Sequence, residues 1–180
     1  MVAAAAQGTP LIPREMPMII RPYRPEDWDL IWAVLEPVFR AGNTYAIRPD
    51  ITAGEAREYW TSSPKQVFVA IDEQTGQLLG TYYVRPNFDG PGSHVCNCGY
   101  IVAEHARGKG VASRMCEHSQ AEAAARGFRA MQYNLVVSTN ERAVRLWKHM
   151  GFEIIGTVPG GFRHPRLGFV DAHIMYKVLA

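Results

Sequence analysis

Residues 107–112 form a short glycine-containing stretch that carries the clearest chemical signal in the chain, and it reads Arg107-Gly108-Lys109-Gly110-Val111-Ala112. It follows a strand-forming run that ends near Ala103 and precedes an alanine-rich helical pattern, so we expect a strand-to-helix junction. The first amides of a helix lack partners within it and lie at the positive end of its dipole, which suits a pyrophosphate. Glycines in the stretch permit unusual dihedrals and close approach. The stretch therefore predicts a phosphate-binding turn, with Arg107 and Lys109 as nearby cations.

Two better-known phosphate motifs do not match this stretch. Lys109 is followed by Gly110, whereas the Walker motif requires Ser or Thr after its lysine and a longer glycine loop. The dinucleotide motif requires a third glycine, which is missing here. A Gly-Lys-Gly turn alone is also typical of an ordinary surface turn, so the flanking segments must decide.

Working outward, the hydrophobic patterns predict strands and helices along most of the chain. Before the turn, residues 66–72 and 78–85 flank Glu73-Gln74-Thr75-Gly76 and predict an antiparallel hairpin. After it, Thr139 or Asn140 is expected to cap a helix that ends at Gly151. The other strands are expected at 18–21, 93–103, 129–137, 152–158 and 169–178, the other helices at 26–40, 53–62 and 110–127, and loops at 87–92 and 159–165. This order predicts an α+β domain with a mixed sheet and helices on its faces.

Composition limits the classes of function. The 180 residues are 47% hydrophobic and 20% charged, which predicts one globular domain over residues 17–180, preceded by a flexible tail at 1–16. The net charge of +2 is too small to favour a nucleic-acid partner. No apolar stretch reaches the roughly 18 residues that span a bilayer. Met1–Ala6 lacks the basic region of a signal peptide, and we expect a cytoplasmic protein.

The three cysteines predict buried thiols and no metal site. An odd number of cysteines without a secretory signal indicates reduced thiols. Cys96 and Cys98 lie two apart in a strand-like run and would share a face, but zinc would need two further ligands. His94 and His105 are the nearest candidates, and neither makes a recognised spacing.

A second motif lies downstream of the turn and reads Asn140-Glu141-Arg142-Ala143-Val144-Arg145-Leu146-Trp147-Lys148-His149-Met150-Gly151-Phe152. Together with Arg-x-x-Gly-x-Ala at 107–112, in this order and at this spacing, it resembles the GCN5-related N-acetyltransferase (GNAT) family over about residues 18–179. The resemblance implies acetyl-CoA as co-substrate and an amine acceptor. It further implies a mostly antiparallel sheet of about seven strands, with helices on both faces and strands splayed at the acetyl-CoA site. Homodimers are common in this family.

The resemblance also implies roles for individual residues on the donor side. Strand backbone at Ile101, Val102 and Ala103 would contact the pantetheine arm. Arg107, Gly108, Lys109, Gly110, Val111 and Ala112 would hold the pyrophosphate, and Asn140 would hydrogen-bond the pantetheine. Ala143 and Trp147 would line the thioester end, although the helical spacing of residues 143, 146, 147 and 150 is equally typical of core packing.

The chemistry requires a neutral amine, and a lysine-like amine of pKa about 10.4 pays roughly 4.6 kcal/mol for neutrality at pH 7, against about 1 kcal/mol for an α-amine of pKa about 7.8. A general base or a desolvating pocket must supply this. Glu104, Asp171, His94 and His173 are all candidate bases, and the residues alone single out none of them. Family members often carry a tyrosine acid where this chain has Trp147, whose indole N–H cannot serve; Tyr133 or Tyr176 are the candidate replacements.

Two asparagines stand in strand-like runs where apolar residues are expected, Asn97 in the run 94–100 and Asn134 in 131–137. They would either be satisfied at a bulge near Gly99 or bind a polar acceptor. Both segments resemble the acetyltransferases that detoxify azetidine-2-carboxylate in yeasts, in which asparagines at matching positions contact the acceptor. This implies a small amino or imino acid as acceptor. Arg163, in the Gly/Pro-rich segment 159–165, is a candidate partner for its carboxylate.

Two other functions remain open at this point. A CoA-binding sensor would keep the fold without catalysis, and Trp147 in place of the acid favours it. A protein N-acetyltransferase would need an extended groove for a peptide.

Overall fold

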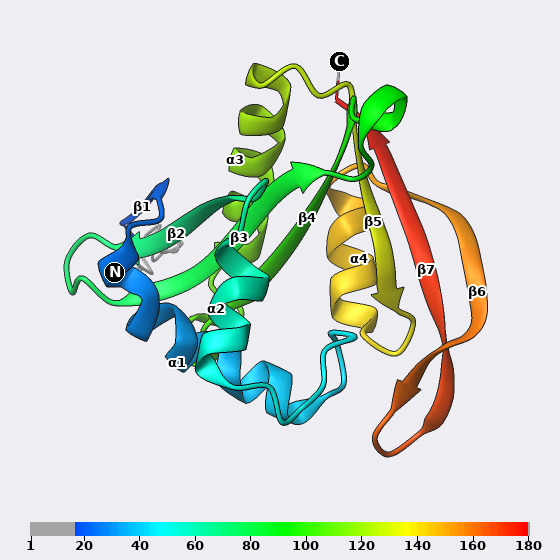
Figure 1. The fold of residues 1–180 in the computed structure, drawn as a ribbon, viewed down its shortest axis with the longest axis horizontal. Helices are drawn as coiled ribbons and strands as arrows, with labels where there is room; N and C mark the ends of the chain where they lie inside the picture. Colours follow the sequence, from blue (N-terminus) through cyan, green and yellow to red (C-terminus); the bar gives the residue numbers. More distant parts are fainter. Residues whose placement is uncertain (1–16, 180) are drawn as a thin grey trace, which may run out of the picture.

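One continuous sheet of seven strands forms the centre of the computed structural model, which describes residues 17–179 (Figure 1). The strands follow the order β1-β2-β3-β4-β5-β7-β6. Only β4 and β5 pair in parallel; every other neighbouring pair is antiparallel. Their bounds are β1 (Met18–Pro22), β2 (Gln66–Asp72), β3 (Leu78–Pro86), β4 (Val95–Val102), β5 (Ala130–Val137), β6 (Glu153–His164) and β7 (Gly168–Val178). The prediction of a mixed, mostly antiparallel sheet is confirmed.

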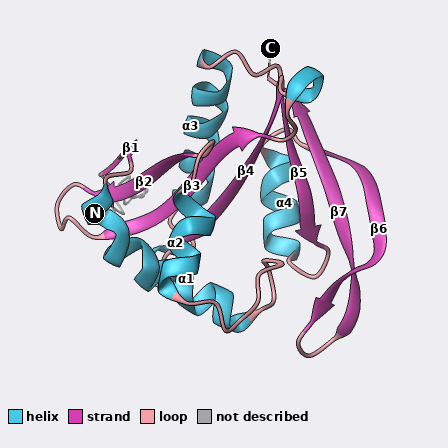
Figure 2. Cartoon of the chain, viewed as in Figure 1, coloured by secondary structure: helices cyan, strands magenta, loops and turns pink. Residues whose placement is uncertain are grey.

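Helices cover both faces of this sheet, as expected (Figure 2). On one face, α1 (Trp28–Ala41) buries the stripe Ile31, Leu35 and Phe39 beside α2 (Ala53–Thr61), which a Thr52–Glu55 capping box starts. On the other face, α3 (Val111–Ala125) and α4 (Glu141–His149) pack on a second buried cluster. Short 3-10 turns lie at Pro25–Asp27, Gly90–Gly92 and Glu104–Ala106.

The parallel pair β4–β5 comes apart soon after it begins. Its backbone pairing consists of Val95 with Ala130 and Cys96 with Met131. Beyond these residues the two strands diverge, and α4 lies beside the opening (Figure 1). Groups of the two backbones that would have bonded each other are therefore left to line an opening in the middle of the sheet, which is the splaying that the sequence resemblance implied.

The expected loop at 159–165 is wrong. Strand β6 continues to His164 and pairs with β7 as far as Gly168, leaving 165–167 as the turn. Pro159 is tolerated because β6 is the edge of the sheet and the register shifts between Val158 and Phe162. Gly160, at φ +61°, absorbs the irregularity. The predicted tail at residues 1–16 lies outside the described residues.

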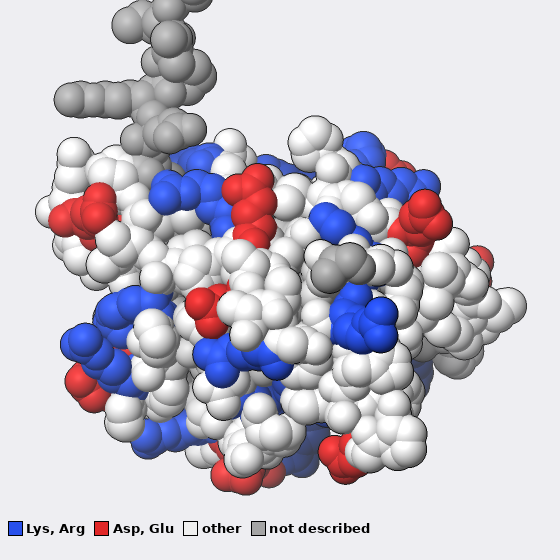
Figure 3. All heavy atoms as spheres, turned by 90° about the horizontal axis from the view of Figure 1, so that it is seen from above, with Lys and Arg blue, Asp and Glu red and all other residues white. Residues whose placement is uncertain are grey.

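The surface carries charges of both signs. Lysine and arginine groups are interspersed with aspartate and glutamate over the face seen in Figure 3, in keeping with the net charge of +2. Among residues 17–179, no helix is long and apolar enough to cross a membrane.

Candidate functional site

A cavity of about 580 Å³ passes through the opening between β4 and β5. One end lies at the glycine turn before α3 and the other lies under the loop between α1 and α2. Most residues that the sequence singled out for binding line this cavity: Asn97, Ile101, Val102, Arg107, Gly108, Gly110, Val111, Ala112, Tyr133, Asn134, Asn140, Ala143 and Trp147. The sheet opening thus gathers residues from β4, β5, α3 and α4 around one space.

The glycine turn presents backbone amides at the start of α3. Gly108 and Gly110 have φ of +80° and +79°, a region that favours glycine. Arg114 makes the first helical bond, from its amide to the Gly110 carbonyl at 3.1 Å, so the amides of residues 111–113 precede the helical ladder. No acidic residue lies in this first turn, and the geometry suits an anion such as a pyrophosphate.

A second arginine lies beside this turn. A Cβ placed on Gly108 would stand 3.4 Å from the guanidinium of Arg142, which lines the cavity from α4. Arg107 lines it as well, whereas Lys109 does not. The Arg142 guanidinium therefore lies beside the exposed amides, and guanidinium binds phosphate oxygens bidentately.

The middle of the cavity lies between β4 and α4. Asn140 caps α4 with its side-chain oxygen, which accepts from the Ala143 amide at 3.3 Å and leaves the amide nitrogen available. Ala103 does not line this cavity but an adjacent one of about 400 Å³, together with Glu104 and Arg107.

Trp147 packs in the core and also lines the cavity, so the core-packing and the binding-site interpretation of its position both hold. Its ring lies 5.0 Å from the rings of Tyr100 and Tyr133. The Tyr133 hydroxyl donates to the Tyr100 hydroxyl at 3.2 Å and lies 3.7 Å from the Cys116 sulfur. Burial raises the pKa of Tyr133 well above its usual value. Its hydroxyl is thus engaged in a buried network.

The far end of the cavity is aromatic and cationic. Tyr45, Tyr59, Tyr83 and Arg85 line it on the α1–α2 side of the sheet. The Tyr83 ring lies across Gly99, where a Cβ would come within 2.7 Å of it. Burial raises the pKa of Tyr83, so its phenol remains a proton-bearing donor.

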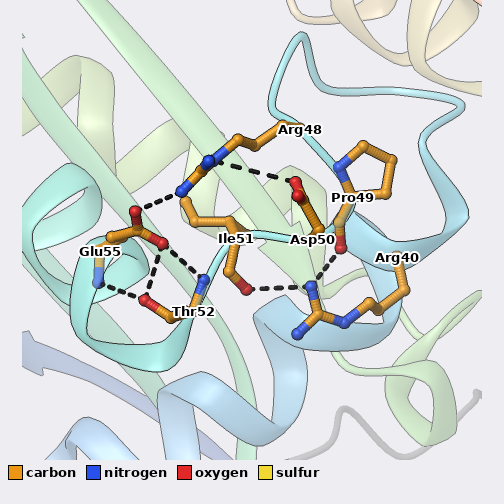
Figure 4. Close-up of polar contacts among 7 residues, drawn as sticks. All are labelled: Arg40, Arg48, Pro49, Asp50, Ile51, Thr52 and Glu55. Carbon is orange, nitrogen blue, oxygen red and sulfur yellow. Dashed lines mark hydrogen bonds and ion pairs between the residues drawn. The ribbon is translucent and has the colours of Figure 1, made fainter.

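The loop between α1 and α2 brings Tyr45 over this end, where its hydroxyl donates to the Tyr100 carbonyl at 2.9 Å. Figure 4 shows how the loop is anchored. Arg40 donates to the carbonyls of Pro49 and, at 2.9 Å, Ile51. Arg48 pairs with Glu55, whose pKa is lowered to about 2, chiefly by hydrogen bonds from Thr52. The loop is therefore fixed to both helices by charge-assisted bonds.

Both singled-out asparagines lie at the point where the sheet opens. Asn97 follows the last backbone pair, and its side-chain amide donates to the Gln132 carbonyl at 2.9 Å, bridging β4 to β5. Asn134 donates to the Asn87 side chain at 2.7 Å and accepts from Gln132 at 2.9 Å. Each asparagine has a structural partner and also borders the cavity, which leaves carbonyl lone pairs for a ligand.

Several other candidates lie outside the cavity. The Asp171 carboxylate accepts from the Gly160 amide at 2.9 Å, and His173 bonds Thr157. His94 faces the Pro91 carbonyl. Arg163 is exposed on β6 and does not line the cavity. Within residues 17–179, no Asp, Glu or His lines it, and no group of three or more potential metal ligands occurs.

Comparison with known proteins identifies the family. The sequence model of the acetyltransferase (GNAT) family matches residues 28–152. N-acetyltransferase aca1 of Schizosaccharomyces pombe is 30% identical over 148 residues, 74% of this chain and 71% of the relative. This chain belongs to the GNAT family.

Two solved structures extend the comparison. A GNAT protein from Kribbella flavida is 40% identical, with a TM-score of 0.85 over 90% of this chain and 98% of its own. The putative acetyltransferase yncA of Salmonella typhimurium, solved with acetyl-CoA, is 19% identical, with a TM-score of 0.75 over 91% of this chain and 94% of its own. The resemblance to the GNAT family is thereby confirmed, and the chain is an N-acetyltransferase.

The sequence alone did not point to the residues at the aromatic end of the cavity. Tyr45, Tyr59, Tyr83 and Arg85 come from three separate elements, and Arg142 was quoted only as part of a motif. Arg85 lies directly opposite Asn97 in the β3–β4 register. The one signal in the sequence was that Arg85, a charged residue, ends a predicted hairpin strand. Its place beside the cavity follows only from the strand register, which the sequence does not show.

Proposed function

We propose that this GNAT enzyme takes the acetyl group from acetyl-CoA and transfers it to the amine of a small molecule, an amino or imino acid. The observation that carries the proposal is one cavity that joins the amide-rich turn before α3 to an aromatic end beneath the loop between α1 and α2, through the opening between β4 and β5. Donor and acceptor can therefore meet inside the sheet from opposite faces. The acetyl-CoA in the yncA structure supports the choice of donor.

On the donor side, we assign the pyrophosphate to the turn at 107–112 with Arg142. Backbone of β4 at Ile101 and Val102 and the free amide nitrogen of Asn140 would hold the pantetheine arm, whereas Ala103 follows β4 and lines the adjacent cavity. Ala143 and Trp147 would border the thioester. The turn has room for the pyrophosphate, because a Cβ added to Gly110 would meet no atom within 4 Å.

In the reaction, acetyl-CoA supplies an activated acetyl group: the amine nitrogen bonds to the acetyl carbon, the C–S bond breaks with its electron pair on the CoA sulfur, and the proton lost by the amine passes to solvent. CoA can leave as a thiolate at a cost of only about 2 kcal/mol at pH 7, because its thiol has a pKa of about 8.5. The reaction therefore does not require a general acid at the position of Trp147. Deprotonating the amine is the larger demand. Because no carboxylate or imidazole among residues 17–179 lines the cavity, neutrality would come from desolvation and from nearby cations, which both favour the uncharged amine. Glu104, Tyr133 and Asp171 remain the side chains to test for proton transfer.

On the acceptor side, Asn97 and Asn134 would accept hydrogen bonds from the substrate through their carbonyl oxygens. Their resemblance to the strand asparagines of yeast azetidine-2-carboxylate acetyltransferases supports a small amino or imino acid. The loop between α1 and α2 carries Tyr45 over this end and is anchored at both of its own ends, which supports a small acceptor over a peptide.

The test is thiol release from acetyl-CoA with a panel of free amines, amino acids, imino acids and peptides. Turnover with free amino or imino acids is the expected result. Acetylation of protein lysines or N-termini alone would favour a protein N-acetyltransferase. Tight CoA binding without turnover on any amine would favour a CoA-binding sensor.

Three broader expectations also belong to this proposal. Residues 17–180 would act as one catalytic domain. The buried, unpaired thiols of Cys96, Cys98 and Cys116 support a reducing cytoplasm. A homodimer is expected from the family, and light scattering in solution would test it.

A further inference from the structure

Arg85 is a cation without a partner at the acceptor end of the cavity. It lies near the end of β3, half-buried, and lines the cavity beside Tyr83. Its Nε is buried and has no hydrogen-bond partner. Among residues 17–179, no ion pair or side-chain hydrogen bond to Arg85 is found, whereas Arg21, Arg40, Arg48, Arg126 and Arg145 each pair with an acid.

A buried donor without a partner destabilises a fold, and a charged one does so more strongly. Such a group is tolerated where a ligand completes its bonding. A guanidinium offers a planar fork of donors that matches a carboxylate through two parallel bonds. The unpaired atom therefore indicates a planar anion as the missing partner.

A second cation strengthens the positive field at this end. The Lys65 ammonium lies 5.1 Å from the Tyr59 ring and 5.5 Å from the Tyr83 ring. Burial lowers the pKa of Lys65, and the charge of Arg85 lowers it further, while Glu58 opposes this. Neither Lys65 nor Glu58 lines the cavity itself, and within residues 17–179 no acid does, so that Arg85 is the charged side chain at this end and Lys65 lies behind the Tyr59 and Tyr83 rings. The acceptor end is thus positively charged.

The position of Arg85 fits the geometry of the transfer. It is paired with Asn97, the residue at which β4 and β5 part. Side chains directly opposite across strands have Cβ atoms roughly 5 Å apart. An anion bound by Arg85 thus lies close to the opening through which the acetyl group would arrive. This position suits an acceptor whose carboxylate is separated from its reacting amine by only a few bonds.

We propose that Arg85, supported by Lys65, binds the carboxylate of the acceptor and makes the enzyme specific for amino or imino acids over simple amines. This inference rests on the proposed function. It assigns to Arg85 the role for which the sequence suggested Arg163, which lies on β6 outside the cavity.

The experiment compares Arg85→Gln with wild type on matched acceptors: the best amino or imino acid from the panel and its primary amide. The expected result is a fall in kcat/KM of about 30-fold or more for the acid, the loss of a bidentate charge-assisted pair. The amide should change less than about threefold, and the Kd for CoA should stay at the wild-type value. Arg85→Lys, which keeps the charge without the fork, should lie between.

Controls and outcomes separate the two proposals. Arg163→Gln, an exposed arginine outside the cavity, should leave both acceptors unaffected. Calorimetric binding of the acid to CoA-loaded protein should weaken in Arg85→Gln by the same factor as kcat/KM, and a wild-type Kd for CoA shows that the variant is folded. Equal losses for acid and amide, or none for either, would overturn the role of Arg85. No turnover by wild type on any amine would instead overturn the proposed function.

Discussion

Gly110→Ala tests whether the turn at residues 107–112 binds the pyrophosphate of CoA. Gly110 has φ +79°, where a residue with a Cβ is disfavoured by about 1–2 kcal/mol. Residues 107–110 are all exposed, so little packing holds a strained backbone, and we expect the alanine variant to relax out of the left-handed region. Relaxation would swing the amides of 111–113 away from the anion site, and binding would have to restore them. The Kd for CoA should therefore rise about 5- to 30-fold, since about 1.4 kcal/mol corresponds to tenfold.

Gly76→Ala is the matched control. Gly76 has φ +70° and, like Gly110, an added Cβ there would meet nothing within 4 Å. It lies in the turn between β2 and β3 and does not line the cavity. Titration calorimetry with CoA should give a wild-type Kd for Gly76→Ala and the weakened Kd for Gly110→Ala. Equal affinities in the two variants would refute the assignment of the pyrophosphate to the turn.

Three further substitutions probe the fold and the reaction. Asp27→Asn should lower the free energy of unfolding by about 2 kcal/mol at pH 7, because Arg21 hydrogen-bonds Asp27 at 2.7 Å and holds the pKa of that carboxyl below its usual value. The ion pair stabilises the fold above about pH 4, and this stabilisation is lost as the pH falls through the lowered pKa of Asp27. The difference in unfolding free energy between wild type and Asp27→Asn, measured in urea, should therefore be smaller at pH 3 than at pH 7, and an equal difference at both pH values would contradict this role of the pair. Tyr133→Phe should keep kcat within about threefold, because the hydroxyl bonds within the core; a fall of about 100-fold or more would make Tyr133 a proton donor. Gly99→Ala should displace Tyr83 and raise KM for the acceptor with KM for acetyl-CoA unchanged, and equal rises in both would count against an acceptor end at Tyr83.

The elements nearest the turn were predictable because their signals are local. The strand before residue 107, the helix after Gly110 and the cap at Asn140 follow from periodicity, glycine and capping chemistry that act over a few residues. By contrast, the sequence Pro159-Gly160-Gly161 reads as a loop, yet lies within β6. An edge strand accepts proline and a bulge accepts glycine, and edge position is a property of the whole sheet.

The aromatic end of the cavity was less predictable because the residues that form it come together only through strand register and sheet topology. Nothing local shows that Arg85 pairs with Asn97, or that the loop after α1 carries Tyr45 to the Tyr100 carbonyl, 55 residues away in sequence. Glu104 was considered as a base because it adjoins the turn in sequence. In the structure it borders the adjacent cavity instead, since neighbours along a strand end can face different spaces.

The most direct measurement of the central claim is a crystal structure of the chain with CoA and the best acceptor from the panel. We predict that the pyrophosphate lies on the amides of residues 111–113 and that the thiol lies in the opening between β4 and β5 beside Trp147. The acceptor carboxylate should lie on Arg85, with the acceptor amine toward Asn97. A pyrophosphate bound away from the turn, or an acceptor that leaves Asn97, Asn134 and Arg85 untouched, would contradict this prediction.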